Sequence, residues 1–143
     1  MQRIETVVTE PKSIVKFLAE DGREFAKERE CFEYEFAIKR KRVDAQVETK
    51  AELDDLPPFD GGENYESHEY KWYKPKTKND LELLRSAYGN KFDDCYIGQW
   101  VCVEICDDGE CWTMPLSNCI DYVNRILSCM GYEISIKPKE AYE

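Results

Sequence analysis

The apolar positions in the first third of the chain change from a short run to a helical period. Residues 13–18, SIVKFL, form a short apolar run that predicts a β-strand, and the Asp21-Gly22 pair that follows indicates a turn. Over residues 26–47 the apolar positions recur every three, four and seven residues, which is typical of two adjacent stripes on a helix. We therefore expect a strand, a turn and a long helix over residues 13–46.

The next segment, residues 47–67, lacks any such period. Its Pro57-Pro58 and Gly61-Gly62 pairs interrupt regular structure. Long connections of this kind usually run over the surface of a domain. We expect a mobile loop here.

The second half, residues 68–137, predicts a strand, a helix, a hairpin, a helix and a strand in that order. The segment SHEYKWYKPK has the alternation of a strand, with Tyr70 and Trp72 on one face and Lys71 and Tyr73 on the other. The remaining elements are expected at residues 78–90 (helix), 96–114 (hairpin), 116–131 (helix) and 132–137 (strand). Together the elements predict a single α+β domain over residues 1–143, with a mostly antiparallel sheet and about three helices, including one long N-terminal helix.

The hairpin, QWVCVEICDDGECWTMP at residues 99–115, concentrates cysteine and tryptophan around an acidic turn. A two-residue turn at Asp108-Gly109 would place Cys106 opposite Cys111. One face would then be the core face, with Val101, Val103, Ile105, Trp112 and Met114. The other face would carry Trp100, Cys102, Glu104, Cys106, Cys111 and Thr113, and we expect another element or subunit to cover it.

Several chemical roles are open to these cysteines. Cys106 and Cys111 could form a disulfide, and Cys102 could join both in a zinc site with Cys95 or Cys119. A nucleophilic cysteine would need a base, and the chain has one histidine, His68. The seven cysteines are an odd number, and a reducing cytosol keeps thiols free. We favour buried free thiols, and expect no metal, no cofactor and no catalytic residue.

Composition and charge narrow the class of protein. The 143 residues are 42% hydrophobic, which is enough for a folded core. The chain contains no apolar run of membrane-spanning length, and MQRIETVVTEPK does not resemble a signal peptide, so we expect a cytoplasmic protein without a membrane partner. The net charge of −10 disfavours direct contact with nucleic acid. The two-striped helix can support self-association into a homo-oligomer.

The segment YKWYKPKTK interleaves aromatic residues with lysines and is the strongest candidate for a ligand site. Its rings could stack on a base or sugar, while its lysines and the start of the following helix could hold phosphates. The alternative is an ordinary strand with a buried tryptophan and a charged edge. The candidate ligand-binding residues, for a nucleotide or a partner, are Tyr70, Lys71, Trp72, Tyr73, Lys74, Lys76, Lys78 and Asn79.

Two segments, SIVKFLAEDGREFAKERECFEYE and EYKWYKPKTKNDLELLRSAYG, resemble parts of small phage and prophage proteins of Gram-positive bacteria and cover about a third of the chain. In the first, the resemblance implies that Phe25 anchors the helix on the strand. Among such proteins, those with an assigned function are often inhibitors of bacterial immunity. Some bind a nuclease directly, and others, such as the Thoeris-inhibiting sponges, sequester a cyclic ADP-ribose signal.

The resemblance therefore implies a non-enzymatic phage-encoded accessory protein in the host bacterial cytoplasm. It would inhibit an anti-phage or CRISPR-type system, either by binding a defence effector or by sequestering its nucleotide second messenger. The alternatives are a small phage interaction, regulatory or assembly protein, and a small nuclease or thiol enzyme.

Overall fold

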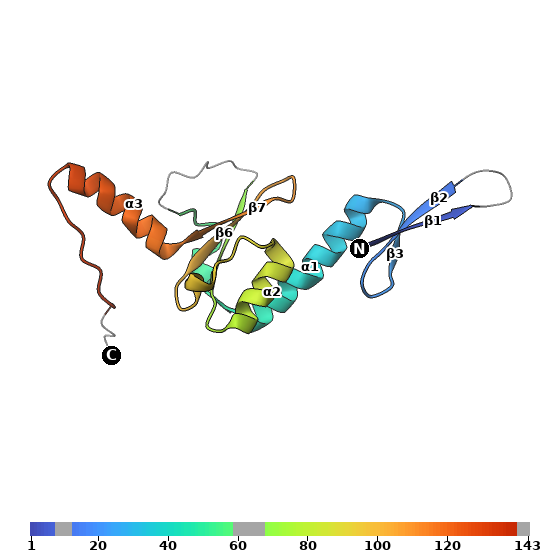
Figure 1. The fold of residues 1–143 in the computed structure, drawn as a ribbon, viewed down its shortest axis with the longest axis horizontal. Helices are drawn as coiled ribbons and strands as arrows, with labels where there is room; N and C mark the ends of the chain where they lie inside the picture. Colours follow the sequence, from blue (N-terminus) through green and yellow to red (C-terminus); the bar gives the residue numbers. More distant parts are fainter. Residues whose placement is uncertain (8–12, 59–67, 140–143) are drawn as a thin grey trace.

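The computed structural model describes residues 1–7, 13–58 and 68–139, and it has an α+β fold with three helices and two antiparallel sheets. The molecule is elongated, with a three-stranded sheet at one end, a central body, and the last helix at the other end (Figure 1). The elements are β1 (Gln2–Val7), β2 (Ser13–Leu18), β3 (Glu24–Phe25), α1 (Glu28–Gln46), β4 (Glu48–Thr49), η1 (Ala51–Leu53), β5 (Glu69–Lys74), α2 (Lys78–Tyr88), η2 (Asp94–Tyr96), β6 (Val101–Ile105), β7 (Cys111–Pro115) and α3 (Leu116–Cys129). No helix in the described part of the chain is long and apolar enough to cross a membrane.

The first sheet, in the order β1-β2-β3, joins the body through α1. Phe25 of β3 lies against Tyr34 of α1 with ring centroids 5.2 Å apart, and the guanidinium of Arg23 lies 4.9 Å from the Tyr34 centroid. The anchoring role expected for Phe25 is therefore confirmed. The expectation of a long N-terminal helix is not, because α1 begins at residue 28 after three strands. The strand over residues 2–7 was not predicted, and the protein has two sheets where one was expected.

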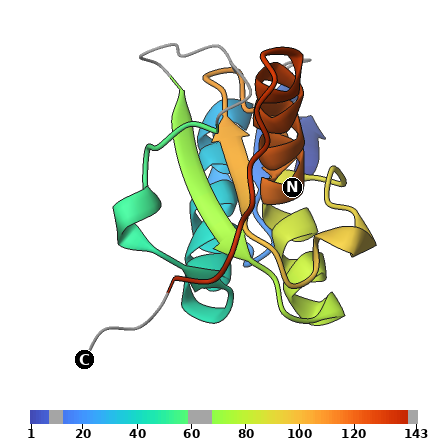
Figure 2. The same cartoon turned by 90° about the vertical axis from the view of Figure 1, so that its left-hand side faces the viewer.

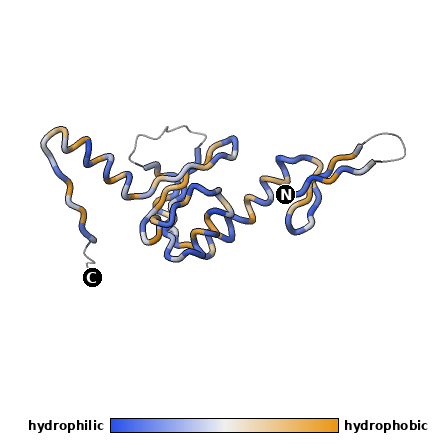
Figure 3. The backbone as a smooth tube through the Cα atoms, in the orientation of Figure 1, coloured by the Kyte–Doolittle hydropathy of each residue, from blue (hydrophilic) through white to orange (hydrophobic). Residues whose placement is uncertain are grey.

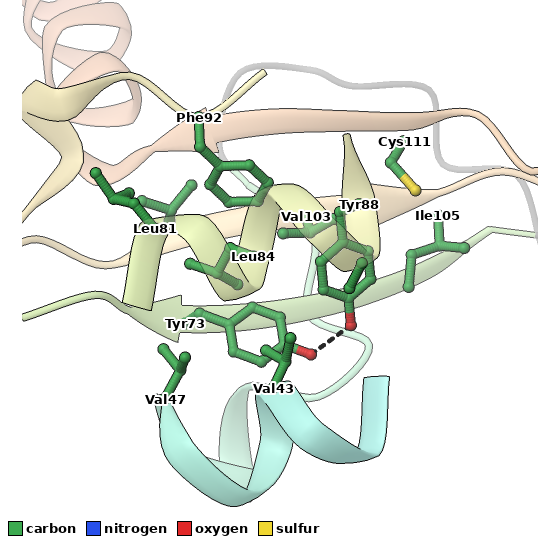
Figure 4. Close-up of a cluster of buried hydrophobic side chains, with 12 residues drawn as sticks. Val43, Val47, Tyr73, Leu81, Leu84, Tyr88, Phe92, Val103, Ile105 and Cys111 are labelled. Atoms are coloured by element: carbon green, nitrogen blue, oxygen red, sulfur yellow. Dashed lines mark hydrogen bonds between the residues drawn. The ribbon is translucent and has the colours of Figure 1, made fainter. Parts of the chain in front are cut away.

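The second sheet, in the order β4-β5-β6-β7, packs one face against α1 and α2. Tyr73, Val101 and Val103 lie on this face and are completely buried. Figure 4 shows the helix residues that meet them, including Val43 of α1 and Leu84 and Tyr88 of α2. This cluster is the main hydrophobic core.

The opposite face of the second sheet forms a smaller core. Tyr70 and Trp72 of β5 and Cys102 of β6 pack there with Cys119 of α3. The indole nitrogen of Trp72 donates a hydrogen bond to the carbonyl oxygen of Leu56 at 2.7 Å. The prediction that another element covers this face is therefore confirmed where Cys119 of α3 packs with Cys102.

The hairpin between β6 and β7 has a three-residue loop in place of the expected two-residue turn. The N–H of Gly109 donates to the carbonyl of Cys106 at 3.0 Å, and the N–H of Cys106 donates to the carbonyl of Glu110 at 2.9 Å. Gly109 has φ of 86°, the left-handed value that closes a type I turn with a bulge. Ile105 consequently pairs with Cys111, one residue away from the predicted register.

This shift moves every side chain of β7 to the other face of the sheet. Trp112 and Met114 lie on the same face as Cys102 and Glu104, and the expected core role of Trp112 is wrong, since its side chain is 52% exposed. Cys111 instead enters the main core beside Ile105. Cys106 and Cys111 are not cross-strand partners, and both are free thiols.

Two further expectations need correction. Part of the segment expected to be a loop, residues 47–67, is regular, because β4 pairs with β5 and η1 follows it; residues 59–67 lie outside the described part of the chain. The expected final strand over residues 132–137 is an extended segment that joins neither sheet in the described structure.

A partly buried polar network ties α1 and α2 to β5. The Tyr73 hydroxyl donates to Asp44 Oδ1 at 2.7 Å and lies 2.5 Å from the Tyr88 hydroxyl. Burial and the neighbouring Tyr88 hold the pKa of Tyr73 well above its usual range, so the hydroxyl keeps its proton. Arg40 of α1 makes a bidentate contact with the Glu69 carboxylate, with N–O distances of 2.5 and 3.2 Å. The buried hydroxyls of Tyr73 and Tyr88 are hydrogen-bonded to each other, which offsets the cost of burying them.

The substitution Tyr73→Phe tests this network. It keeps the ring but removes the hydroxyl, which leaves Asp44 and Tyr88 without that partner. We expect the free energy of unfolding, measured by urea titration, to fall by about 1–3 kcal/mol. The control Tyr122→Phe, on an exposed tyrosine, should change it by less than about 0.5 kcal/mol. Equal effects of the two substitutions would contradict the role of the network.

The substitution Gly109→Ala tests the hairpin loop. An alanine at this position would have to adopt the left-handed backbone conformation of Gly109, and its Cβ would lie 3.3 Å from Cε1 of Phe32. We expect the free energy of unfolding to fall by about 1–2 kcal/mol because of the backbone conformation. It should fall further if the Phe32 ring must shift. Gly98→Ala is the matched control, because Gly98 has φ of 87° and no atom within 4 Å of the added Cβ. It carries the cost of the left-handed backbone without the contact with Phe32. A Gly109→Ala protein as stable as the unsubstituted one would contradict the left-handed turn.

Candidate functional site

An acidic cleft lies at the loop end of the β6–β7 hairpin. It has a volume of about 580 Å³ and opens to solvent. The cleft is lined by His68, Glu104, Cys106, Asp107, Asp108, Glu110 and Trp112. It therefore combines the histidine of the chain with a cysteine and several carboxylates.

Strand pairing explains why three of these residues meet. Tyr70 of β5 pairs with Glu104 of β6, and Glu69 pairs with Ile105. One step further along the same register, His68 falls opposite Cys106. Because alternate residues of a strand share a face, the side chains of His68, Glu104 and Cys106 lie together on the face opposite the main core.

The three side chains are close enough to share one ligand. One potential ligand atom from each lies within 4.8 Å of the other two, and all three residues are half-buried. The Nδ1 atom of His68 lies 2.5 Å from Glu104 Oε1. The site therefore presents nitrogen, oxygen and sulfur donors from two adjacent strands.

The surroundings of Cys106 oppose formation of a thiolate. Partial burial and the negative charges of Glu104, Asp108 and Glu110 raise the pKa of the Cys106 thiol above the ordinary value for cysteine. Nucleophilic cysteines need the opposite shift, which neighbouring positive charge provides. The protein alone therefore does not activate Cys106 for nucleophilic attack, although a histidine and a carboxylate lie beside it.

The structure does not gather the aromatic and lysine residues of the expected ligand strand into one surface. Tyr70, Trp72 and Tyr73 are all buried, at 3%, 7% and 0% exposure, so their ring faces are occupied by packing. Lys71 pairs with Asp54 at 3.1 Å and Lys76 with Glu48 at 3.2 Å. Lys74 is half-buried, and Lys78 and Asn79 are exposed at the start of α2. The burial of the rings matches the alternative of an ordinary strand, and a ligand role for the eight residues stays a prediction.

The sequence offers His68 as a possible base for a nucleophilic cysteine, Cys106 among them, but does not single out Glu104. The signal that links them is the pairing of β5 with β6, which places His68 and Cys106 at the same end of neighbouring strands. The zinc sites considered from the cysteines used Cys111, which the hairpin register places on the opposite face. The chain matches no protein family model, no curated protein and no solved structure.

The raised pKa of Cys106 predicts slow alkylation near neutral pH. We expect the iodoacetamide reaction rate of Cys106, followed by mass spectrometry of its peptide, to rise with pH and to reach half its maximum above the pH found for an ordinary cysteine peptide. In Glu110→Gln, one of the charges that raises the pKa is removed, and the midpoint should move to lower pH. A midpoint for the unsubstituted protein below that of the cysteine peptide would mean that the thiolate is stabilised.

Proposed function

We propose that this protein is a non-enzymatic binding protein that acts by docking on a protein partner, as a phage-encoded inhibitor of a bacterial defence effector. The observation that carries the proposal is the exposed apolar surface at the α3 end of the molecule. The resemblance of two segments to small phage proteins supplies the biological setting.

The apolar end consists of α3 and the extended segment that follows it. In Figure 1 the helix projects away from the body, and the chain then turns back beside it, as Figure 2 also shows. Figure 3 shows apolar positions along both. The exposed apolar residues of the apolar end are Tyr122, Ile126, Met130, Tyr132, Ile134 and Ile136. Met130 and Tyr132 are each 67% exposed.

The two parts enclose a groove with apolar walls. Its volume is about 330 Å³, and it is lined by Leu116, Cys119, Ile120, Val123, Ile134 and Ile136. A monomeric protein rarely exposes a contiguous apolar surface of this kind unless it binds something there. The amphipathic helix and the alternating strand-like segment are both forms that proteins use to recognise other proteins.

The charge of the chain indicates the class of partner. A net charge of −10 accelerates association with a basic protein and opposes association with an acidic one. Proteins that hold nucleic acid carry basic surfaces, so a nucleic-acid-handling effector fits both the charge and the apolar end. Sequestration of a nucleotide has less support, because the rings expected to stack on it are buried.

A thiol enzyme is the second candidate, favoured by the proximity of His68, Glu104 and Cys106. We prefer the binding role because the acidic surroundings raise the pKa of the thiol that would have to attack.

The proposal is tested by expressing the protein in bacterial strains that each carry one anti-phage system and by counting phage plaques. We expect plaques to be restored on a strain whose effector is the partner. Ile126→Asp should abolish this effect, because a carboxylate among the exposed apolar side chains of α3 would have to be buried against the partner, at a cost of about 2 kcal/mol or more. With the partner purified, affinity should fall as salt screens the charge attraction.

Ile14→Asp is the matched control. Ile14 is also an exposed isoleucine, at 47%, but it lies in β2 at the other end of the molecule. It should restore plaques as well as the unsubstituted protein does when immunoblots show equal amounts. Restoration by Ile126→Asp to the same degree, or no restoration on any strain, would count against the proposal.

A further inference from the structure

We propose that His68, Glu104 and Cys106 form a binding site for one divalent transition-metal ion of the zinc class. The proposal concerns a surface separate from the apolar end. It starts from the convergence of three different ligand types from two hydrogen-bonded strands.

The present separations lie close to those of a metal centre. Zinc holds nitrogen and oxygen ligands at about 2.0–2.2 Å and sulfur at about 2.3 Å, so two ligands of one tetrahedron lie roughly 3.3–3.8 Å apart. The potential ligand atoms here lie within 4.8 Å of one another, and His68 Nδ1 and Glu104 Oε1 are closer, at 2.5 Å. Shifts of about 1 Å in the positions of these ligand atoms would give the separations of a tetrahedral site.

The donor set selects the class of ion. Calcium and magnesium prefer oxygen ligands throughout, whereas nitrogen and thiolate ligands favour zinc and neighbouring transition metals. Asp107, Asp108 and Glu110 line the same cleft, and one of their carboxylates or a water molecule can complete the coordination. Their negative charge also concentrates cations at the site.

The cluster differs from an ordinary surface ion pair. An ion pair between His68 and Glu104 does not account for the Cys106 sulfur beside them. A cluster of loop carboxylates alone would offer only oxygen ligands. The side chains of His68 and Glu104 are 15% and 20% exposed, so the site is sheltered and still reachable from the cleft. Partial shelter of this kind strengthens coordination and leaves an entry path.

The test uses the full chain in reducing, metal-free buffer and titrates it with Co²⁺, a spectroscopic substitute for Zn²⁺. We expect one ion per chain by native mass spectrometry, intense visible bands of tetrahedral Co²⁺, and a near-ultraviolet charge-transfer band from Cys106 thiolate. Zn²⁺ should displace the bands, and excess Ca²⁺ should not.

Variants assign the ligands. Cys106→Ser should remove the charge-transfer band, and His68→Gln and Glu104→Gln should each weaken Zn²⁺ binding by roughly tenfold or more. Cys129→Ser is the matched control, because this exposed thiol lies at the end of α3 and should leave the spectrum unchanged. Circular dichroism and urea titration of each metal-free variant separate loss of a ligand from loss of the fold.

Three results would overturn the proposal. The first is no charge-transfer band in the unsubstituted protein. The second is a band that survives Cys106→Ser or disappears in Cys129→Ser. The third is binding that Ca²⁺ competes away, which would show an acidic loop that holds cations through its carboxylates alone.

Discussion

The register of the β6–β7 hairpin is the constraint on which the rest of the structure depends. It is set by the hydrogen bond from the N–H of Gly109 to the carbonyl of Cys106 and by the left-handed conformation of Gly109. With this loop, Cys111 fills the main core and Cys106 stays on the opposite face. A shift by one residue would exchange the two faces of β7, placing Trp112 in the core and moving Cys111 to the face that carries Cys106.

The helix α1 connects the second sheet, which contains this hairpin, to the first sheet. Its C-terminal half packs on the second sheet through Val43 and, through Asp44, accepts a hydrogen bond from Tyr73. Its N-terminal half holds the first sheet through Tyr34 and Phe25. In the middle of the helix, Arg40 contacts Glu69 at the start of β5, which ties the helix to the second sheet. The same helix therefore serves two sheets that do not pair with each other.

The sequence predicts the kinds of elements well and their pairing less well. The helical periods of α1, α2 and α3 and the alternation of β5 are local properties, so the pattern alone identifies them. The register of the hairpin depends on whether Asp108-Gly109 closes a two-residue or a three-residue loop, and both fit the same letters. The final segment, residues 132–137, has the alternation of a strand, yet alternation does not supply a neighbouring strand to pair with. The acidic cleft was missed for the same reason, because the proximity of His68 to Cys106 is a property of pairing between β5 and β6.

The two surfaces for which we propose functions lie at opposite ends of one strand. The cleft borders the start of β7 at Glu110 and Trp112, and α3 begins directly after Pro115 at its end. Five residues of strand span about 17 Å, so an ion in the cleft is too distant to touch a partner held at the start of α3. The strand between them is the edge strand of the sheet and pairs with β6 along its whole length. Because this pairing is continuous, it holds the two surfaces apart while each is occupied. An ion in the cleft would therefore stabilise the hairpin loop without altering the apolar end, and coupling between the two would require the pairing of β6 with β7 to change.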